Sequence, residues 1–381
     1  MKPTLTIEKT ARLVARSLGI TPEALAEGLR PSVPADLPAV LALRRQVLAD
    51  QLTWDDATYL RWRYGFGEDG PALAACWVCE RNGELLGVIG IETLEVRAGQ
   101  LQRPVHAVMD LMVRPDLDGS GLGVWINQAV CQRLGCVLAI GSNPNSKGVV
   151  ARTFDALPDR RSHTHPLHFD HFMAKRLSPK WLAQGVAALA DAAMTLARIG
   201  RLWLPAWSTR VTRVTGEDDL GAHVASLLQR ALRDDRVEIL RSVERLRHRL
   251  MRNPRSRVDI WLAWRGERVT GLLATRRTAI EEGRLALQLM DLVLAPGDER
   301  AALRALLARA TAHGYRLGAD YLTATLYDPP LEGQLQSLFF RRQANEYETL
   351  AWHCTDAAFR EAVLARKGWS LCDLHTDRDQ G

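Results

Sequence analysis

Apolar residues along the first half of the chain alternate between short runs with period two and longer stretches with helical spacing. Helical spacing covers Leu37 to Leu48, and Asn82-Gly83 joins two apolar strands as a type I′ turn signal. A long strand from Val105 to Val113 then leads into a helix from Leu122 to Leu134 and a short buried strand from Cys136 to Ile140. Strand, turn, helix and strand with short connections predict a parallel pair beside a largely antiparallel sheet.

The second half repeats this order. The strand signature Met109-Asp110-Leu111 recurs as Met290-Asp291-Leu292, and Arg61-Trp62-Arg63 upstream of the first is echoed by Arg247-His248-Arg249 upstream of the second. Order and spacing are kept while most identities are lost, which is typical of a duplicated domain. The sequence therefore predicts an α/β (α+β) protein of two related domains, each a mixed, largely antiparallel sheet with a parallel strand pair and flanking helices.

The repeat divides the chain into four segments. An N-terminal helical extension, two short helices split near Gly19, precedes the first domain, and a helical linker separates the two domains. The expected bounds are 1–28 for the extension, 29–170 for the first domain, 171–216 for the linker and 217–381 for the second domain.

The linker helix, expected from Lys180 to Leu202, is apolar and ends in a basic tract that carries tryptophan. One interpretation is a connecting helix packed between the two domains. The other is a helix that contacts a membrane surface or a partner through residues 180–210.

Composition adds that the chain is a globular protein with 47% hydrophobic and 25% charged residues. The net charge of +6 over 381 residues suits anionic metabolites and is too small for a nucleic-acid footprint. The N-terminal stretch has no signal-peptide pattern, so we expect a cytoplasmic protein. Cys76 and Cys79 form a C-x-x-C inside an apolar strand pattern, where period two sends them to opposite faces, so we expect reduced structural cysteines and no redox or zinc site.

The sharpest local signal for chemistry is the turn after the long strand. Gly119, Gly121 and Gly123 crowd the turn that opens the helix from Leu122. Glycines there let backbone N–H groups point into one concavity, and the helix N-terminus adds partial positive charge. This turn is a candidate site for a phosphate or a pyrophosphate.

The run DLMVRPDLDGSGLG resembles the acetyl-CoA loop of the GNAT superfamily, whose pattern is R/Q-x-x-G-x-G/A after a strand that ends V-x-P. Gly121 and Gly123 fit the two small positions, whereas Asp118 stands where the family has Arg or Gln. The resemblance covers residues 29–170 well and 215–381 more faintly. The proteins most similar in organisation are tandem-domain GNAT proteins of bacterial surface-polysaccharide and secondary-metabolite gene clusters.

The resemblance implies an acyltransferase, with N-acetyl transfer the first expectation. The acyl group would pass from acyl-CoA to an amine or a hydroxyl of a small polar or sugar-like acceptor. The residues expected to bind the acyl-CoA are Met112, Val113, Arg114, Gly119, Ser120, Gly121, Leu122 and Gly123. In the second copy the turn reads GDERAALRA, with Asp298 and Glu299 where a phosphate would enter, so that domain is not expected to bind CoA in the same way.

Three residues are candidates for the general base. His106 and Asp110 share one face of the long strand, and Glu92 lies on the strand before it. Because Asp291 repeats Asp110 in the copy without a glycine-rich loop, a structural role for Asp110 is favoured. Phe154 stands where many relatives have a tyrosine acid.

Four histidines cluster near the end of the first domain, at His163, His165, His168 and His171. By the family pattern they lie on a closing strand that faces the acceptor. A metal site is the alternative, because imidazole is a common ligand, but no metal is expected.

Other function classes remain open at this point. A Fem-type aminoacyl-tRNA-dependent peptidyltransferase also pairs two GNAT-like halves, but it would favour a stronger basic patch. A non-catalytic scaffold or sensor of the same fold is a third class, and an acyl carrier protein is an alternative donor. No nucleic-acid partner is expected, and the sequence leaves the oligomeric state open.

Overall fold

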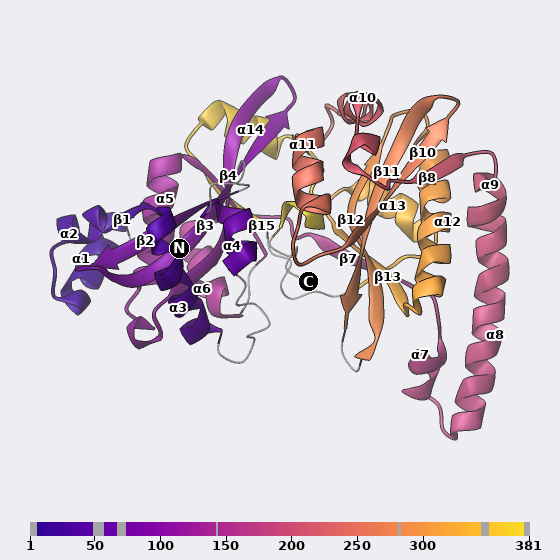
Figure 1. Ribbon diagram of the computed structural model, residues 1–381, viewed down its shortest axis with the longest axis horizontal. Helices are drawn as coiled ribbons and strands as arrows, with labels where there is room; N and C mark the ends of the chain where they lie inside the picture. The colour runs from indigo at the N-terminus through magenta and orange to yellow at the C-terminus, as the bar shows by residue number, and fades with distance from the viewer. Residues whose placement is uncertain are drawn as a thin grey trace.

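The computed structural model describes residues 6–48, 57–66, 74–141, 144–280, 283–343 and 350–376, and it contains two sheets side by side (Figure 1). The elements up to the linker are α1 (Ile7–Leu18), α2 (Pro22–Glu27), β1 (Leu29–Pro31), α3 (Leu37–Val47), α4 (Ala57–Tyr64), β2 (Ala74–Arg81), β3 (Glu84–Ala98), β4 (Leu101–Val113), α5 (Leu122–Leu134), β5 (Cys136–Ile140), α6 (Pro144–Thr153), β6 (Asp155–Leu157) and β7 (Arg161–Pro166).

The linker and the second half follow. Their elements are α7 (Asp170–Ala174), α8 (Lys180–Arg198), a π-helical turn (Ile199–Trp203), α9 (Leu204–Ala206), β8 (Arg210–Arg213), α10 (Ala222–Arg230), β9 (Val237–Ile239), α11 (Val243–Leu246), a second π-helical turn (Arg247–Met251), β10 (Val258–Arg265), β11 (Arg268–Ala279), β12 (Leu285–Leu294), α12 (Glu299–Leu317), β13 (Tyr321–Leu326), α13 (Pro329–Ser337), β14 (Arg341–Arg342), β15 (Leu350–Cys354) and α14 (Ala357–Leu364).

The two sheets have the same plan. The first runs β1-β2-β3-β4-β5-β15-β6, with β9 added to the end of β3, and the second runs β8-β10-β11-β12-β13-β7-β14. The parallel pairs are β4 with β5 and β12 with β13, and each is connected by a helix, α5 or α12. The mixed sheets with parallel pairs and flanking helices confirm the predicted fold class.

Each sheet contains an interior strand from the other half of the chain, and the first sheet also contains β9 of the second half, at the end of β3. β7 from the first half pairs with β13 in the second sheet, and β15 from the second half pairs with β5 in the first. Both lie inside their sheets, because β14 and β6 add to their outer sides. The division of the sequence near residues 170 and 217 therefore does not follow the sheets. The sequence predicts that the closing strand with His163 and His165 belongs to the first domain. In the structure this strand, β7, belongs to the second sheet.

Several local predictions are confirmed. The turn between β2 and β3 has positive φ at both Asn82 (50°) and Gly83 (79°), as a type I′ turn requires. α5 and β5 have the bounds that the apolar spacing predicts. In the N-terminal extension, Gly19 ends α1 in the left-handed conformation and separates it from α2.

Helices cover both faces of the first sheet. α1 and α5 pack on one face around Ile89 and Val137, and α3 and α4 pack on the other around Val88 and Met112. Cys79 is buried with the first group and Cys76 with the second, so the C-x-x-C does point to opposite faces. Burial raises the pKa of both thiols to about 12, which leaves them neutral and unreactive.

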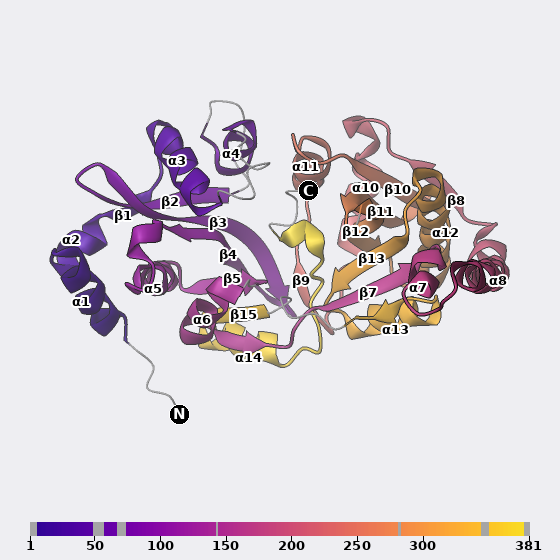
Figure 2. The same ribbon diagram turned by 90° about the horizontal axis from the view of Figure 1, so that it is seen from below.

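The linker helices lie on the outer side of the second domain. In both views α8 stands at the edge of the molecule farthest from the first domain, beside α7 and beyond α12 (Figures 1 and 2). The expectation of a connecting helix packed between the two domains is therefore wrong.

Candidate active site

The strands β4 and β5 separate at the middle of the first sheet. Their pairing stops at Val108 and Ala139, although β4 continues for a further five residues to Val113. One extra residue of β4 beside Ile89 forms a bulge at the same place, where Asp110 adopts a positive φ of 49°. The result is a V-shaped opening between the two strands.

Apolar side chains that are only partly buried lie on β4 beside this break in the pairing and on α6. Val108, Leu111 and Val113 project from β4, and Val150 of α6 packs against the same core. Leu111 and Val113 reach toward Gly123, where an added Cβ would lie 3.6 and 3.5 Å from them. The opening therefore leads along β4 to the first turn of α5, and an apolar chain would suit it.

Three of the amides in the glycine-rich turn are engaged by the protein itself, and one of them is the Ser120 N–H, which donates to the Leu117 carbonyl at 3.1 Å. The Gly119 N–H donates to Asp118 Oδ1 at 2.9 Å, and the Leu122 N–H donates to Ser120 Oγ at 3.2 Å. Gly119 and Ser120, both expected to contact the cofactor, instead shape the turn.

Other amides at the same helix start are open. Within the described residues, the N–H groups of Gly121, Gly123 and Val124 have no hydrogen-bond partner, and the first bond of the helix is donated by Trp125 to the Gly121 carbonyl at 3.0 Å. Gly121 has a φ of 84°, a conformation that favours glycine. Three open donors at a helix N-terminus form a site for an anion.

The remaining residues expected around the cofactor contribute less than the sequence suggested. Arg114 is paired with Asp116 at 2.7 Å and Glu84 at 3.0 Å, and these carboxylates raise its pKa. Its guanidinium is thus already occupied by two carboxylates. Met112 and Leu122 are buried in the two cores, so only their backbones can face a ligand.

The matching place in the second domain is closed. The Gly297 N–H donates to Glu299 Oε2 at 2.7 Å, and Asp298 is paired with Arg265 at 2.6 Å and Arg268 at 3.1 Å. Acidic side chains thus occupy the helix start, as the sequence predicted.

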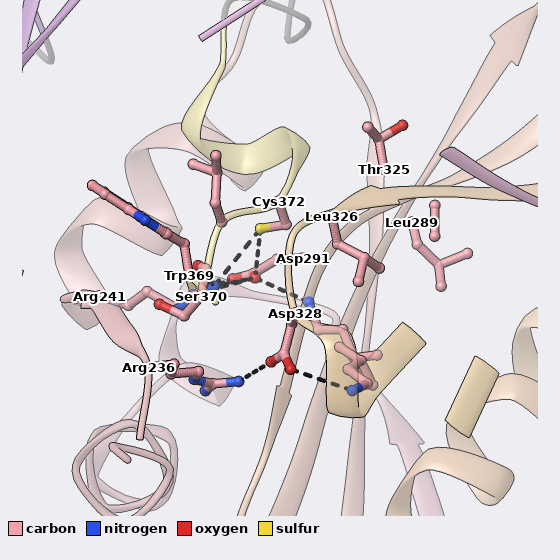
Figure 3. Close-up of a pocket in the computed structure, with 14 residues that line it drawn as sticks. Arg236, Arg241, Leu289, Asp291, Thr325, Leu326, Asp328, Trp369, Ser370 and Cys372 are labelled. Atoms are coloured by element: carbon pink, nitrogen blue, oxygen red, sulfur yellow. Dashed lines mark hydrogen bonds and ion pairs between the residues drawn. The ribbon is translucent and has the colours of Figure 1, made fainter. Parts of the chain in front are cut away.

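The V-shaped opening of the second domain is filled by the C-terminal segment. Pairing of β12 with β13 stops at Leu289 and Ala324, but residues 369–372 lie over the gap and leave a cavity of about 30 Å³ (Figure 3). A cavity of that size holds one or two waters and excludes a pantetheine arm.

Asp110 and Asp291 both hold their bulges through side-chain contacts. Tyr64 Oη donates to Asp110, and Arg44 lies 3.9 Å from it. Asp291 accepts from Arg241 at 2.9 Å and lies between that guanidinium and the Cys372 thiol (Figure 3). Asp110 and Asp291 occupy corresponding positions, and each accepts hydrogen bonds from a neighbouring side chain. This similarity supports a structural role for Asp110.

Glu92, the third candidate base, is committed to an ion cluster between the domains. Its side chain is fully buried and accepts from Arg245 and Arg249 of the second half, and Arg63 lies 3.9 Å away. Both carboxylate oxygens are thus taken up by guanidinium groups, and neither is turned toward an acceptor. The geometry argues against Glu92 as a base, and sequence reasoning missed its partners.

His106 is the candidate that faces open space. It lines a pocket of about 680 Å³ between the domains, together with Thr93 and Trp77 of the first domain and Ser242 and Arg245 of the second. Its Nδ1 lies 3.1 Å from Thr93 Oγ1, so Nε2 is the nitrogen left for a ligand. Burial lowers the pKa of His106, which keeps the ring neutral near pH 7.

The histidine cluster serves the second sheet. His165 is buried, contacts the Leu338 carbonyl at 3.2 Å and accepts from Arg198 Nε at 3.0 Å, and burial lowers its pKa to about 3. His163 is buried on the same strand face, 3.9 Å from Glu332. Among the described residues, no group of three or more His, Cys, Asp or Glu side chains is arranged to hold a metal ion.

Comparison with known proteins finds a family match for part of the chain. Residues 42–147 match the acetyltransferase (GNAT) family, and no curated protein matches the chain. Among solved structures, a GCN5-related N-acetyltransferase from Anabaena variabilis is similar with a TM-score of 0.56 and 10% identity over 84% of this chain and 71% of that one.

Two other solved structures show the same likeness. A conserved Enterococcus faecalis protein of unknown function, described as a probable N-acyltransferase, has a TM-score of 0.56, 10% identity and the same coverage of 84% and 71%. A GCN5-related N-acetyltransferase from Kribbella flavida has a TM-score of 0.50 and 14% identity over 86% of this chain and 71% of that one. At these identities the likeness establishes the fold.

Proposed function

Because residues 42–147 match the acetyltransferase (GNAT) family, we propose that this chain transfers an acyl group, acetyl in the first instance, from acyl-CoA to a small polar acceptor. The observation that carries the proposal is the asymmetry between the two domains. In the first, a V-shaped opening with apolar walls leads to open amides at a helix start, and in the second the equivalent opening is filled.

The donor would bind along β4. Its diphosphate would accept hydrogen bonds from Gly121, Gly123 and Val124, and the dipole of α5 would stabilise the negative charge. The pantetheine arm would pass between Leu111 and Val150, which brings the thioester to the bulge. Asp118 is exposed and already caps Gly119, so its repulsion costs about 1 kcal/mol in water.

The acceptor would occupy the pocket of about 680 Å³ between the domains. Ser242, Glu244 and Arg245 offer hydrogen-bond donors and acceptors there, and Trp77 offers an aromatic face, which together suit a polar, sugar-like molecule with an amine or a hydroxyl. The second domain would thus supply part of the acceptor site and no donor site.

His106 would act as the general base. Neutral at pH 7, it would take the proton from the acceptor amine while the nitrogen forms a bond to the thioester carbon. The tetrahedral intermediate would then break its C–S bond and release CoA as a thiolate, which takes up a proton from solvent. A backbone N–H near Met112 or Val113 would stabilise the oxyanion.

Thermal unfolding with acetyl-CoA, a longer acyl-CoA and free CoA tests the donor site. Gly121→Glu would place a carboxylate among the open amides, and Gly297→Glu is the matched control because its φ of 86° is nearly that of Gly121, at 84°. We expect each CoA species to raise the melting temperature of the parent protein and of the control, and to leave the Gly121 variant unchanged.

The acceptor side requires a separate measurement. Release of free thiol from acetyl-CoA is followed with amino sugars and other small amines, with the His106→Ala variant as reference. No thermal shift with any CoA species would overturn the donor assignment. Binding without turnover on any acceptor would instead favour the scaffold or sensor alternative.

A further inference from the structure

The outer face of the linker helices is an apolar stripe. Trp181, Leu189, Leu196, Leu204 and Trp207 are 71%, 73%, 70%, 65% and 88% exposed. The first four follow one another at intervals of seven or eight residues, about two helical turns, so they lie on one side. The residues exposed between them are mostly alanine and glycine, with no acid among them.

This stripe is long enough to be a docking surface. In the part of the chain that the structure describes, the 27-residue segment Lys180–Ala206 is the one helical segment long and apolar enough to cross a membrane. An 18-residue window within it has a mean hydropathy of 1.2, and 17% of that window is buried. At 1.5 Å per residue the segment is about 40 Å long. Exposed apolar surface of this extent on a soluble protein marks a contact site.

The inner side of the same segment is tied to the protein. Arg198 donates to His165, to Tyr315 and to the Pro166 carbonyl, and the Phe169 N–H donates to Asp191 at 3.1 Å. Crossing a bilayer would break these contacts and place Asp191 and Arg198 in hydrocarbon. The geometry therefore favours a helix that lies flat on a surface.

The exposed charges around the stripe are mostly basic, although Asp170 at the start of α7 is an exposed acid beside α8. Lys175, Arg176 and Lys180 are exposed at one end, and Arg201 and Arg210 at the other. The only acid within the segment is Asp191, which is engaged on the inner side. Tryptophan at both ends and basic residues beside an apolar face are typical of helices in the interface of a lipid bilayer.

A second copy of the chain is a poorer occupant. Antiparallel pairing of two stripes would bring Lys180 of one copy toward Arg201 of the other, and parallel pairing would bring the lysines together. Neither arrangement offers an acid on this face to compensate. We propose that Lys180–Ala206, with Trp207, is a peripheral membrane-binding surface that lies flat in the interface of a bilayer containing anionic lipid.

Vesicle sedimentation tests this proposal with the full chain. Vesicles of phosphatidylcholine alone are compared with vesicles that contain phosphatidylglycerol at roughly three parts in ten. The double variant Leu189→Glu with Leu196→Glu disrupts the stripe. The control is Leu13→Glu with Leu364→Glu, since these leucines are 50% and 59% exposed elsewhere on the molecule.

We expect binding to the anionic vesicles, a loss of about tenfold or more for the stripe variant and none for the control. Raising the salt from about 0.1 M to about 1 M should weaken the binding, because the screening length falls from about 10 Å to about 3 Å. Acetyl-CoA should shift the melting temperature of the stripe variant as it shifts that of the parent, which shows that the variant is folded and separates this test from the proposed acyl transfer.

Light scattering after size exclusion tests the alternative, in which the stripe joins two copies of the chain. No binding to either vesicle would overturn the proposal. So would a dimer that the stripe variant converts to a monomer, since the stripe would then be an interface between two copies of the chain.

Discussion

The indole of Trp62 stacks on the imidazole of His248, with ring centroids 5.1 Å apart and 17° between the ring planes. These residues are the central members of the two echoed tripeptides, Arg61-Trp62-Arg63 and Arg247-His248-Arg249. Arg63 and Arg249 both approach Glu92 beside the stack. The corresponding helical segments of the two halves thus meet face to face at the domain interface.

Trp62→Ala tests how much this contact holds the domains together. Loss of the stack and of the buried ring area should lower the free energy of unfolding by about 2–3 kcal/mol. Urea unfolding followed by circular dichroism measures this free energy. Trp181→Ala, at a side chain 71% exposed, should change it by less than about 0.5 kcal/mol, and an equal loss for both variants would contradict a special role for the stack.

Glu92→Gln separates a structural from a catalytic role for that carboxylate. The change leaves the buried Arg249 and the partly buried Arg245 without their counter-charge, so we expect a loss of about 3–5 kcal/mol in unfolding free energy. Glu95→Gln is the matched control, three residues along the same strand and exposed.

The kinetic outcome is equally specific. At a temperature where the Glu92 variant is folded, kcat should keep its pH profile, because the carboxylate does not contact the proposed acceptor pocket. A normal unfolding free energy combined with a lost acidic limb of the pH profile would instead restore Glu92 as the base.

Local pattern predicted the elements of the first domain but not which sheet each strand joins. The bounds of α5 and β5 follow from apolar spacing and from the glycines at their ends, which are properties of neighbouring residues. The exchange of β7 and β15 depends on pairing between distant segments, which no local period records. For the same reason the ion pairs of Glu92 with Arg245 and Arg249 could not be predicted from the sequence, although Arg249 belongs to the echoed tripeptide.

The strand exchange predicts that the two halves do not fold separately. A fragment of residues 1–216 lacks β15 with Trp352 and α14 with Phe359, and both side chains are almost fully buried in the first domain. Alone, this fragment and the fragment 217–381 should each lack a cooperative thermal transition. Expressed together, they should co-purify as a folded pair, because each supplies an interior strand to the other's sheet. A cooperative transition in the isolated first fragment would show that the exchange is dispensable.

The pH dependence of transfer tests His106. A general base must be neutral, and burial lowers the pKa of His106 below the ordinary value of 6.5, so the acidic limb of kcat/KM should lie below pH 6.5. His106→Ala should reduce kcat by about a hundredfold and remove that limb, while the thermal shift with acetyl-CoA stays unchanged because the open amides belong to another element. His223→Ala, at an exposed histidine of the second domain, should leave both the rate and the limb intact. If the limb persists at the same pH in the His106 variant, another group in the pocket accepts the proton, and the lost rate reflects only the shape of the pocket.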